Sequence, residues 1–150
     1  MKNNMDENNK IQSNINKYGW HFLFVFDPEC KKENFSYSIG FEETFNYPEI
    51  MIFGLKKEIA HQILTDIAGD LKNGLHYEVD KKLNNVLNGD LKVVFKKVNT
   101  EAFDEFLGTA VNFYQKPFRA LVMFWPDKKN LFPFEGGCEV TVQNEALKII

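Results

Sequence analysis

Apolar runs separated by polar turns predict five strands along the chain. The run at residues 18–26 is dense in aromatic and β-branched side chains and stops at Asp27 and Pro28, which is typical of a buried strand followed by a turn. The run at 118–125 is almost continuously apolar, which indicates an interior strand. The predicted strands are residues 18–26, 35–40, 49–53, 91–98 and 118–125, with a further strand-like segment at 139–142.

The second predicted strand has one bulky face and one very small face. Phe35, Tyr37 and Ile39 alternate with two serines and Gly40. Such small side chains indicate that another group approaches the backbone closely. A packing helix is the preferred interpretation, and a bound ligand or partner is the alternative.

Helical spacing predicts two main helices. Apolar residues recur three and four positions apart between residues 59 and 71, and Asn73 with Gly74 supplies the stop. A second apolar stripe runs from Phe103 to Tyr114, with Thr100 as the expected cap and Pro117 beyond its end. Residues 42–48 are polar, contain a proline and are expected to form a loop.

The order of these elements predicts an α+β fold. Consecutive strands without a crossover pair antiparallel more readily than parallel, so we expect a single mixed, mostly antiparallel sheet of about five to six strands with two main helices packed on it. Residues 17–150 form one domain on this interpretation. Residues 1–16 are rich in Asn, Lys and acidic side chains and are expected to be a flexible N-terminal arm.

Composition and charge argue against several kinds of partner and of cellular location. The net charge is −3, Arg119 is the only arginine, and the lysines are scattered, which argues against a nucleic-acid partner. No apolar run is long enough for a signal peptide or a membrane span, so no membrane is expected and the predicted location is cytoplasmic. Cys30 and Cys138 lie in no metal or redox motif; two reduced thiols are preferred, although one disulfide is formally open.

Three stretches together span residues 18–137: YGWHFLFVF, FSYSIGFEETFNYPEIMIFGL followed by a helix, and VMFWPDKKNLFPFEGG. They resemble an uncharacterised bacterial family, the domain of unknown function 4262. The family has a tryptophan at the position of Phe134 here. The resemblance implies an architecture and candidate positions but no reaction, because the family is defined without an activity.

Candidates for acid and base chemistry are few. His21 lies inside an apolar strand, and Glu42 and Glu43 follow the small-faced strand, with Glu49 beginning the next one. Paired carboxylates act as acid and base when their surroundings separate their pKa values, but adjacent glutamates in a loop are usually solvated. The three histidines are not spaced as metal ligands, so no metal site is predicted.

A ligand site is predicted where residues 37–43 meet residues 125–127. This adjacency would bring small strand residues, aromatic walls and carboxylates to one end of the sheet. Arg119, as the sole guanidinium, can bind a carboxylate or phosphate with two nitrogens, or can pair with a glutamate. The candidate ligand-binding residues are Tyr37, Ser38, Gly40, Arg119, Trp125 and Asp127.

The sequence favours a non-enzymatic binding module, of an accessory or toxin-neutralising type, for a protein or small ligand. Its motivation is the lack of a catalytic motif together with the aromatic excess and the acidic charge. A small hydrolase or transferase using a Glu/His acid–base pair is the first alternative. A binder of flavin or another aromatic cofactor is the second; no cofactor, substrate or oligomeric state is indicated by a motif.

Overall fold

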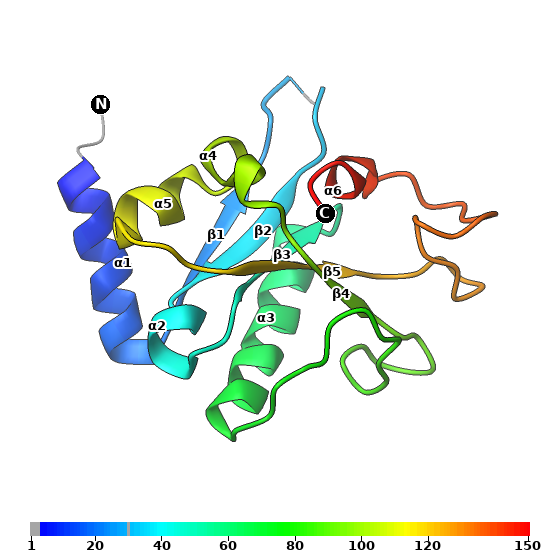
Figure 1. The fold of residues 1–150 in the computed structure, drawn as a ribbon, viewed down its shortest axis with the longest axis horizontal. Helices are drawn as coiled ribbons and strands as arrows, with labels where there is room; N and C mark the ends of the chain where they lie inside the picture. The colour runs from blue at the N-terminus through cyan, green and yellow to red at the C-terminus, as the bar shows by residue number, and fades with distance from the viewer. Residues whose placement is uncertain (1–3, 30) are drawn as a thin grey trace.

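One five-stranded mixed sheet organises the chain in the computed structural model, which describes residues 4–29 and 31–150. The strand order is β1-β2-β3-β5-β4 (Figure 1). Only β3 and β5 pair parallel, and the other three pairings are antiparallel, so the predicted α+β class is confirmed. The strands are β1 (His21–Val25), β2 (Phe35–Ile39), β3 (Glu49–Phe53), β4 (Val94–Lys97) and β5 (Ala120–Phe124).

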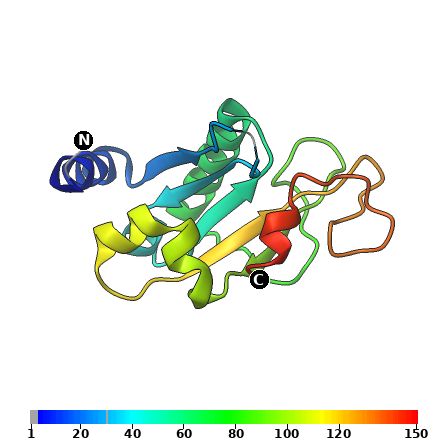
Figure 2. The same cartoon turned by 90° about the horizontal axis from the view of Figure 1, so that it is seen from above.

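Helices cover both faces of the sheet. Figure 2 shows α3 on one face and α4, α5 and α6 on the other, with α1 beside β1. Within the described part of the chain, no helix is long and apolar enough to cross a membrane. The helices are α1 (Asn4–Tyr18), α2 (Phe41–Phe45), α3 (Lys57–Lys72), the short 3-10 helix η1 (Thr100–Ala102), α4 (Phe103–Phe106), α5 (Gly108–Tyr114) and α6 (Asn144–Leu147).

The core beneath α3 explains the small face of β2. Ile50 and Ile52 of β3 pack with the apolar stripe of α3, and Ser36 pairs with Ile52 on the same face of the sheet. Helix α3 contacts β2, and both serines of β2 are fully buried. Helix α3 is therefore a group that packs against the small face of β2, which is the preferred interpretation.

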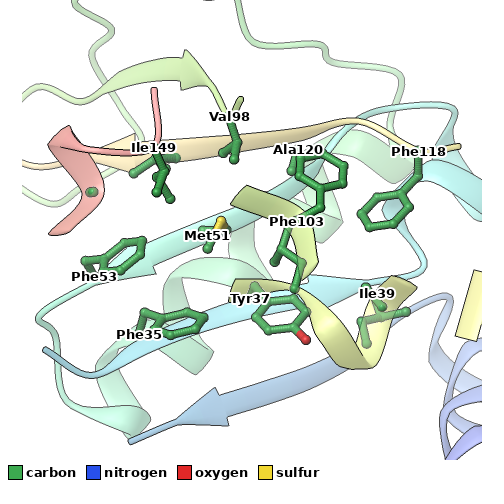
Figure 3. Close-up of a cluster of buried hydrophobic side chains, with 14 of the residues drawn as sticks. Phe35, Tyr37, Ile39, Met51, Phe53, Val98, Phe103, Phe118, Ala120 and Ile149 are labelled. Carbon is green, nitrogen blue, oxygen red and sulfur yellow. The ribbon is translucent and has the colours of Figure 1, made fainter. Parts of the chain in front are cut away.

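Aromatic rings dominate the core on the opposite face (Figure 3). Phe35 stacks on Phe53 across the β2–β3 pair with ring centroids 4.9 Å apart. Phe103 of α4 lies at the same centroid distance from Phe118, which precedes β5. Offset ring pairs of this kind add roughly 0.5–1.5 kcal/mol beyond the apolar area they bury. The phenylalanine surplus is thus used largely to fill the interior.

The expectation of an unpacked arm does not hold for residues 4–16. Residues 4–18 form α1, and Ile11 and Ile15, one helical turn apart, are buried in the same core as α5. The remaining residues of the helix are mostly polar, which is why its composition resembles that of a solvated arm. Two apolar anchors at helical spacing suffice to place it on the domain.

The predicted helix at 100–114 is broken into three pieces. The backbone leaves helical geometry at Leu107, with φ −118° and ψ 31°, and Gly108 follows, a residue that weakens helices. Asn99, not the predicted Thr100, supplies the N-cap, since its Oδ1 accepts a hydrogen bond from Glu101 N at 3.1 Å.

Two further local predictions were wrong. Residues 42–48 are not all loop, because α2 forms at their start. Residues 139–142 do not form a strand. The backbone N–H of Glu139 donates to Asp127 Oδ2 at 3.1 Å instead of joining a sheet ladder.

The packing of α1 can be tested by truncating its two anchors. Ile11→Ala and Ile15→Ala should each lower the free energy of unfolding by about 2–4 kcal/mol, because each leaves a void in a closely packed core. Urea unfolding followed by circular dichroism measures this loss. Ser13→Ala, at an exposed position between them, is the matched control and should change the free energy by less than about 0.5 kcal/mol. Isoleucine variants that match this control would mean that α1 does not pack.

Candidate functional site

The predicted meeting of residues 37–43 with residues 125–127 is wrong. Phe35 pairs with Phe53, so β2 and β3 run in opposite directions, and the far end of β2 lies beside Glu49. The indole Nε1 of Trp125 donates to the Phe53 carbonyl at 2.8 Å, which is the other end of β3. The two segments therefore lie at opposite ends of the sheet, because the direction of β5 follows from its parallel pairing with β3.

Trp125 and Asp127 hold the loop that follows β5. Gln143 fixes the Trp125 backbone from both sides, accepting from its N–H at 3.1 Å and donating to its carbonyl at 2.7 Å. Asp127 accepts hydrogen bonds from the backbone N–H groups of Lys129, Leu131 and Glu139. These backbone hydrogen bonds, led by the one from Leu131, keep the pKa of Asp127 below its usual value.

The other end of the sheet is built around the buried carboxylate of Glu49, the first residue of β3. The side chain is fully inaccessible to water, and both its oxygens accept hydrogen bonds from several elements. We call this arrangement the Glu49 cluster. Its five donors are Ser38 Oγ at 2.8 Å and Phe41 N at 3.0 Å on Oε1, and Gly40 N at 3.0 Å, Glu42 N at 3.1 Å and the Tyr114 hydroxyl on Oε2.

Burial and hydrogen bonding act on Glu49 in opposite directions. Burial raises the pKa of Glu49 to about 7, while hydrogen bonds from Tyr114, Glu42 N, Ser38 and Gly40 N act to lower it. The carboxylate also satisfies N–H groups in the first turn of α2 that have no partner inside the helix. This long-range capping explains why a short polar segment becomes helical.

Gly40 is required by the backbone at this point. Its φ is +122°, a conformation that favours glycine, and a Cβ there would lie 2.9 Å from the Cα of Trp20. The same turn lets Gly40 N reach both Glu49 and the Tyr114 hydroxyl. Ser38 and Gly40 lie together with their polar atoms engaged inside the protein, and Tyr37 is likewise buried, while a ligand-binding role for these three residues stays a prediction.

Glu42 links the Glu49 cluster to Arg119. The Arg119 guanidinium donates from Nη2 to Glu42 Oε1 at 2.7 Å and from Nε to both carboxylate oxygens, and its backbone N–H donates to Oε2 at 3.0 Å. Although partial burial acts to raise the pKa of Glu42, the hydrogen bonds and charge of Arg119 hold it below its usual value. Nη2 also donates to the Asn46 carbonyl at 3.2 Å, so the guanidinium is fixed on two sides.

A cavity of about 450 Å³ opens beside this arginine, within the size range of small-molecule sites. Its walls come from the α2–β3 loop, the segment after α3, the end of β4 and the start of β5. Aromatic rings form much of the wall, and basic groups supply most of its charge. We call it the Arg119 pocket; it is lined by Asn46, Tyr47, Pro48, His76, Tyr77, Val79, Lys97, Val98, Thr100, Phe103, Phe118, Arg119, Ala120 and Leu121.

The candidate acid and base residues do not form a pair. His21 begins β1 and its Nδ1 contacts Asn14 Nδ2 at 2.8 Å, whereas Glu42 is held by Arg119 and Glu43 is exposed on α2. No hydrogen bond joins His21 to either glutamate. Among residues 4–29 and 31–150, no three His, Cys, Asp or Glu side chains gather as metal ligands would. Cys30 lies outside the described residues, so its pairing with Cys138 stays untested.

Several residues of the Arg119 pocket were missed from the sequence. Tyr47, His76 and Lys97 lie on three different segments, and no local spacing connects them. Tyr114 was recognised only as part of an apolar stripe, because helical spacing does not show that its hydroxyl reaches Glu49. The sequence indicated the importance of Glu49 only weakly, through a carboxylate at the start of a predicted buried strand.

The Glu49 cluster predicts a specific pH dependence of stability. With a pKa of about 7 in the folded protein and an ordinary value of 4.5 when unfolded, Glu49 binds more protons in the native state between these values. Stability therefore falls as the pH rises through this window. The stability difference between the wild type and Glu49→Gln should shrink by about 2–3 kcal/mol from pH 5 to pH 8 in urea unfolding.

Glu43→Gln is the matched control, since this exposed side chain lies on the same short helix and accepts none of the hydrogen bonds of the Glu49 cluster. Subtracting the variant from the wild type removes the titration of shared groups such as His21. A difference that stays constant across this range would show that the donors keep Glu49 ionised throughout.

The comparisons with known proteins identify one family. No curated protein and no solved structure matches the chain. The family model described as "Domain of unknown function (DUF4262)" matches residues 14–139, which include β1 to β5 and the whole Glu49 cluster. The chain therefore belongs to the DUF4262 family.

Proposed function

We propose that this domain is a non-enzymatic binding module whose ligand occupies the Arg119 pocket. The observation that carries the proposal is the fixed guanidinium. Glu42 and the Asn46 carbonyl hold Arg119 through Nε and Nη2, while Nη1 makes no hydrogen bond with any described residue. A donor that is already oriented loses little conformational entropy when a ligand binds.

The chemistry of the pocket favours a flat aromatic carboxylate. Tyr47, Phe103 and Phe118 supply apolar walls that are themselves firmly packed, since each is less than a tenth exposed. Arg119 is neutralised by Glu42, but Lys97 lines the same cavity without an ion pair to a described residue. One unpaired cation with a free guanidinium nitrogen suits a ligand that carries a single negative charge.

Catalysis by the Glu49 carboxylate is not part of this proposal. Glu49 has no exposed surface, and all five of its contacts are with the protein's own donors. A general acid or base must reach the atom whose proton it transfers. The cluster is better explained as the support that places Glu42, and through it Arg119, at the rim of the pocket.

A binding experiment with 2-naphthoate tests the proposal. Backbone amide signals of residues lining the pocket should shift on titration, measured by ¹⁵N–¹H NMR. Lys97→Gln should weaken binding about fivefold and Arg119→Lys about tenfold, because a lysine keeps the charge but loses the oriented nitrogens. Lys128→Gln, an exposed change at the opposite end of the sheet, is the control and should leave the affinity unchanged.

Binding of 2-naphthoate that shifts other surfaces, or that is indifferent to both pocket variants, would contradict the assignment of this cavity. So would the absence of shifts for every member of a series from benzoate to 2-naphthoate, because the fixed guanidinium would then have no carboxylate partner.

A further inference from the structure

A second cavity, of about 650 Å³, lies at the free edge of the sheet. It is bounded by α1, the start of the edge strand β1 and α3. It shares no lining residue with the Arg119 pocket. We call it the His21 cleft. Its lining residues are Lys10, Asn14, Tyr18, Trp20, His21, Phe22, Lys57, His61 and Thr65.

The charge of this cleft differs from that of the whole protein. The chain has a net charge of −3, yet the lining contains two lysines and two histidines and no Asp or Glu. Lys10 and Lys57 form no ion pair with a described residue, whereas several other lysines of the protein are paired with carboxylates. The cleft is therefore a local cationic surface on an acidic protein.

His21 is held in one orientation within the cleft. Asn14 on α1 donates through Nδ2 to Nδ1 of His21 at 2.8 Å, so the neutral imidazole carries its proton on Nε2. Burial, followed by the charge of Lys10, lowers the pKa of His21 from its ordinary value. The ring thus presents an N–H donor that has no partner among the described residues, at a site that is only 9% exposed.

His61 is fixed by aromatic contacts. Its ring stacks against Trp20 with centroids 6.1 Å apart and meets Phe22 edge-on at 4.9 Å. These contacts hold the imidazole on the α3 side of the cleft. Tyr18, which is 62% exposed, leaves a ring available at the mouth of the cleft.

We propose that the His21 cleft binds a phosphate monoester that carries an aromatic ring. Lys10, Lys57 and the N–H groups of His21 and His61 surround the phosphate, and the ring packs against Tyr18 and Phe22. A phosphate monoester carries a charge of about −1.5 to −2 near neutral pH, which the two lysines balance more fully than they would balance a singly charged carboxylate, while the imidazoles add N–H donors. This site is independent of the Arg119 pocket and does not depend on its function.

Titration with phenyl phosphate, followed by ¹⁵N–¹H NMR, tests the inference. The backbone amide signals of Asn14, His21 and His61 should shift together and define one affinity. Lys57→Gln and His21→Leu should each weaken binding by about fivefold to thirtyfold, as expected for loss of one hydrogen bond to a charged group. Lys72→Gln, at the exposed far end of α3, is the matched control and should leave the affinity unchanged.

Two further probes separate the parts of the proposal. Phenol should produce no saturable shift in the cleft, and inorganic phosphate should bind at least tenfold more weakly than phenyl phosphate. Inorganic phosphate that binds as tightly as phenyl phosphate would overturn the role of the ring. The absence of shifts with phenyl phosphate, or binding unaffected by Lys57→Gln and His21→Leu in variants whose spectra remain folded, would overturn the site itself.

Discussion

The Glu49 carboxylate imposes the constraint around which one end of the molecule is arranged. A carboxylate without access to water costs several kcal/mol unless other groups replace its hydration. Five donors do so here, and they come from β2, the turn at Gly40, the first turn of α2 and the end of α5. Segments that are far apart in the sequence must therefore meet at one point, and any of them that moved would leave a buried charge unsatisfied.

This constraint extends from the core to the surface in a short series of contacts. Glu42 N donates to Glu49, the Glu42 carboxylate holds the Arg119 guanidinium, and Glu49 N donates to the Arg119 carbonyl at 3.0 Å. The buried cluster fixes both the backbone and the side chain of the arginine. Rigid support of this kind favours the proposed binding function, because it lowers the entropy lost when a ligand binds.

The two cavities occupy different parts of the sheet and differ in chemistry. The Arg119 pocket is largely aromatic, with an arginine whose charge is offset by Glu42, whereas the His21 cleft contains four basic groups and no carboxylate. The negative net charge gave no indication of the basic residues in either cavity. Net charge describes the whole surface and says nothing about where the few unpaired cations lie.

Local sequence patterns predicted the helices and strands better than they predicted the contacts between them. Strand β3 was predicted with its observed ends, and the apolar stripe at residues 59–71 lies within α3, because both are set by short-range periodicity and nearby turn residues. Helix α1 was mistaken for an unpacked arm because two buried apolar residues, Ile11 and Ile15, stand among mostly polar side chains. Short helix α2 was missed because its first turn is capped by Glu49, which follows it in the sequence.

For the candidate site, too, the sequence identified individual residues better than the contacts between distant segments. Ser38, Gly40, Glu42 and Arg119 were all singled out and do lie at one end of the sheet. Trp125 was assigned to that end and lies at the other, because the parallel register of β3 with β5 cannot be derived from either strand alone. The pocket residues Tyr47, His76 and Lys97 meet only through the tertiary fold, so no sequence spacing relates them.

The role of the Glu49 carboxylate can be examined most directly by following three backbone amides, those of Gly40, Phe41 and Glu42, in a ¹⁵N–¹H NMR titration of the wild-type protein. Each donates to Glu49, so their shifts should change together with a single midpoint at the pKa of about 7 to which burial raises this group. Shifts that are insensitive to pH, or that follow the midpoint of an ordinary exposed glutamate, would contradict the conclusion that burial outweighs the hydrogen bonds and raises the pKa of Glu49.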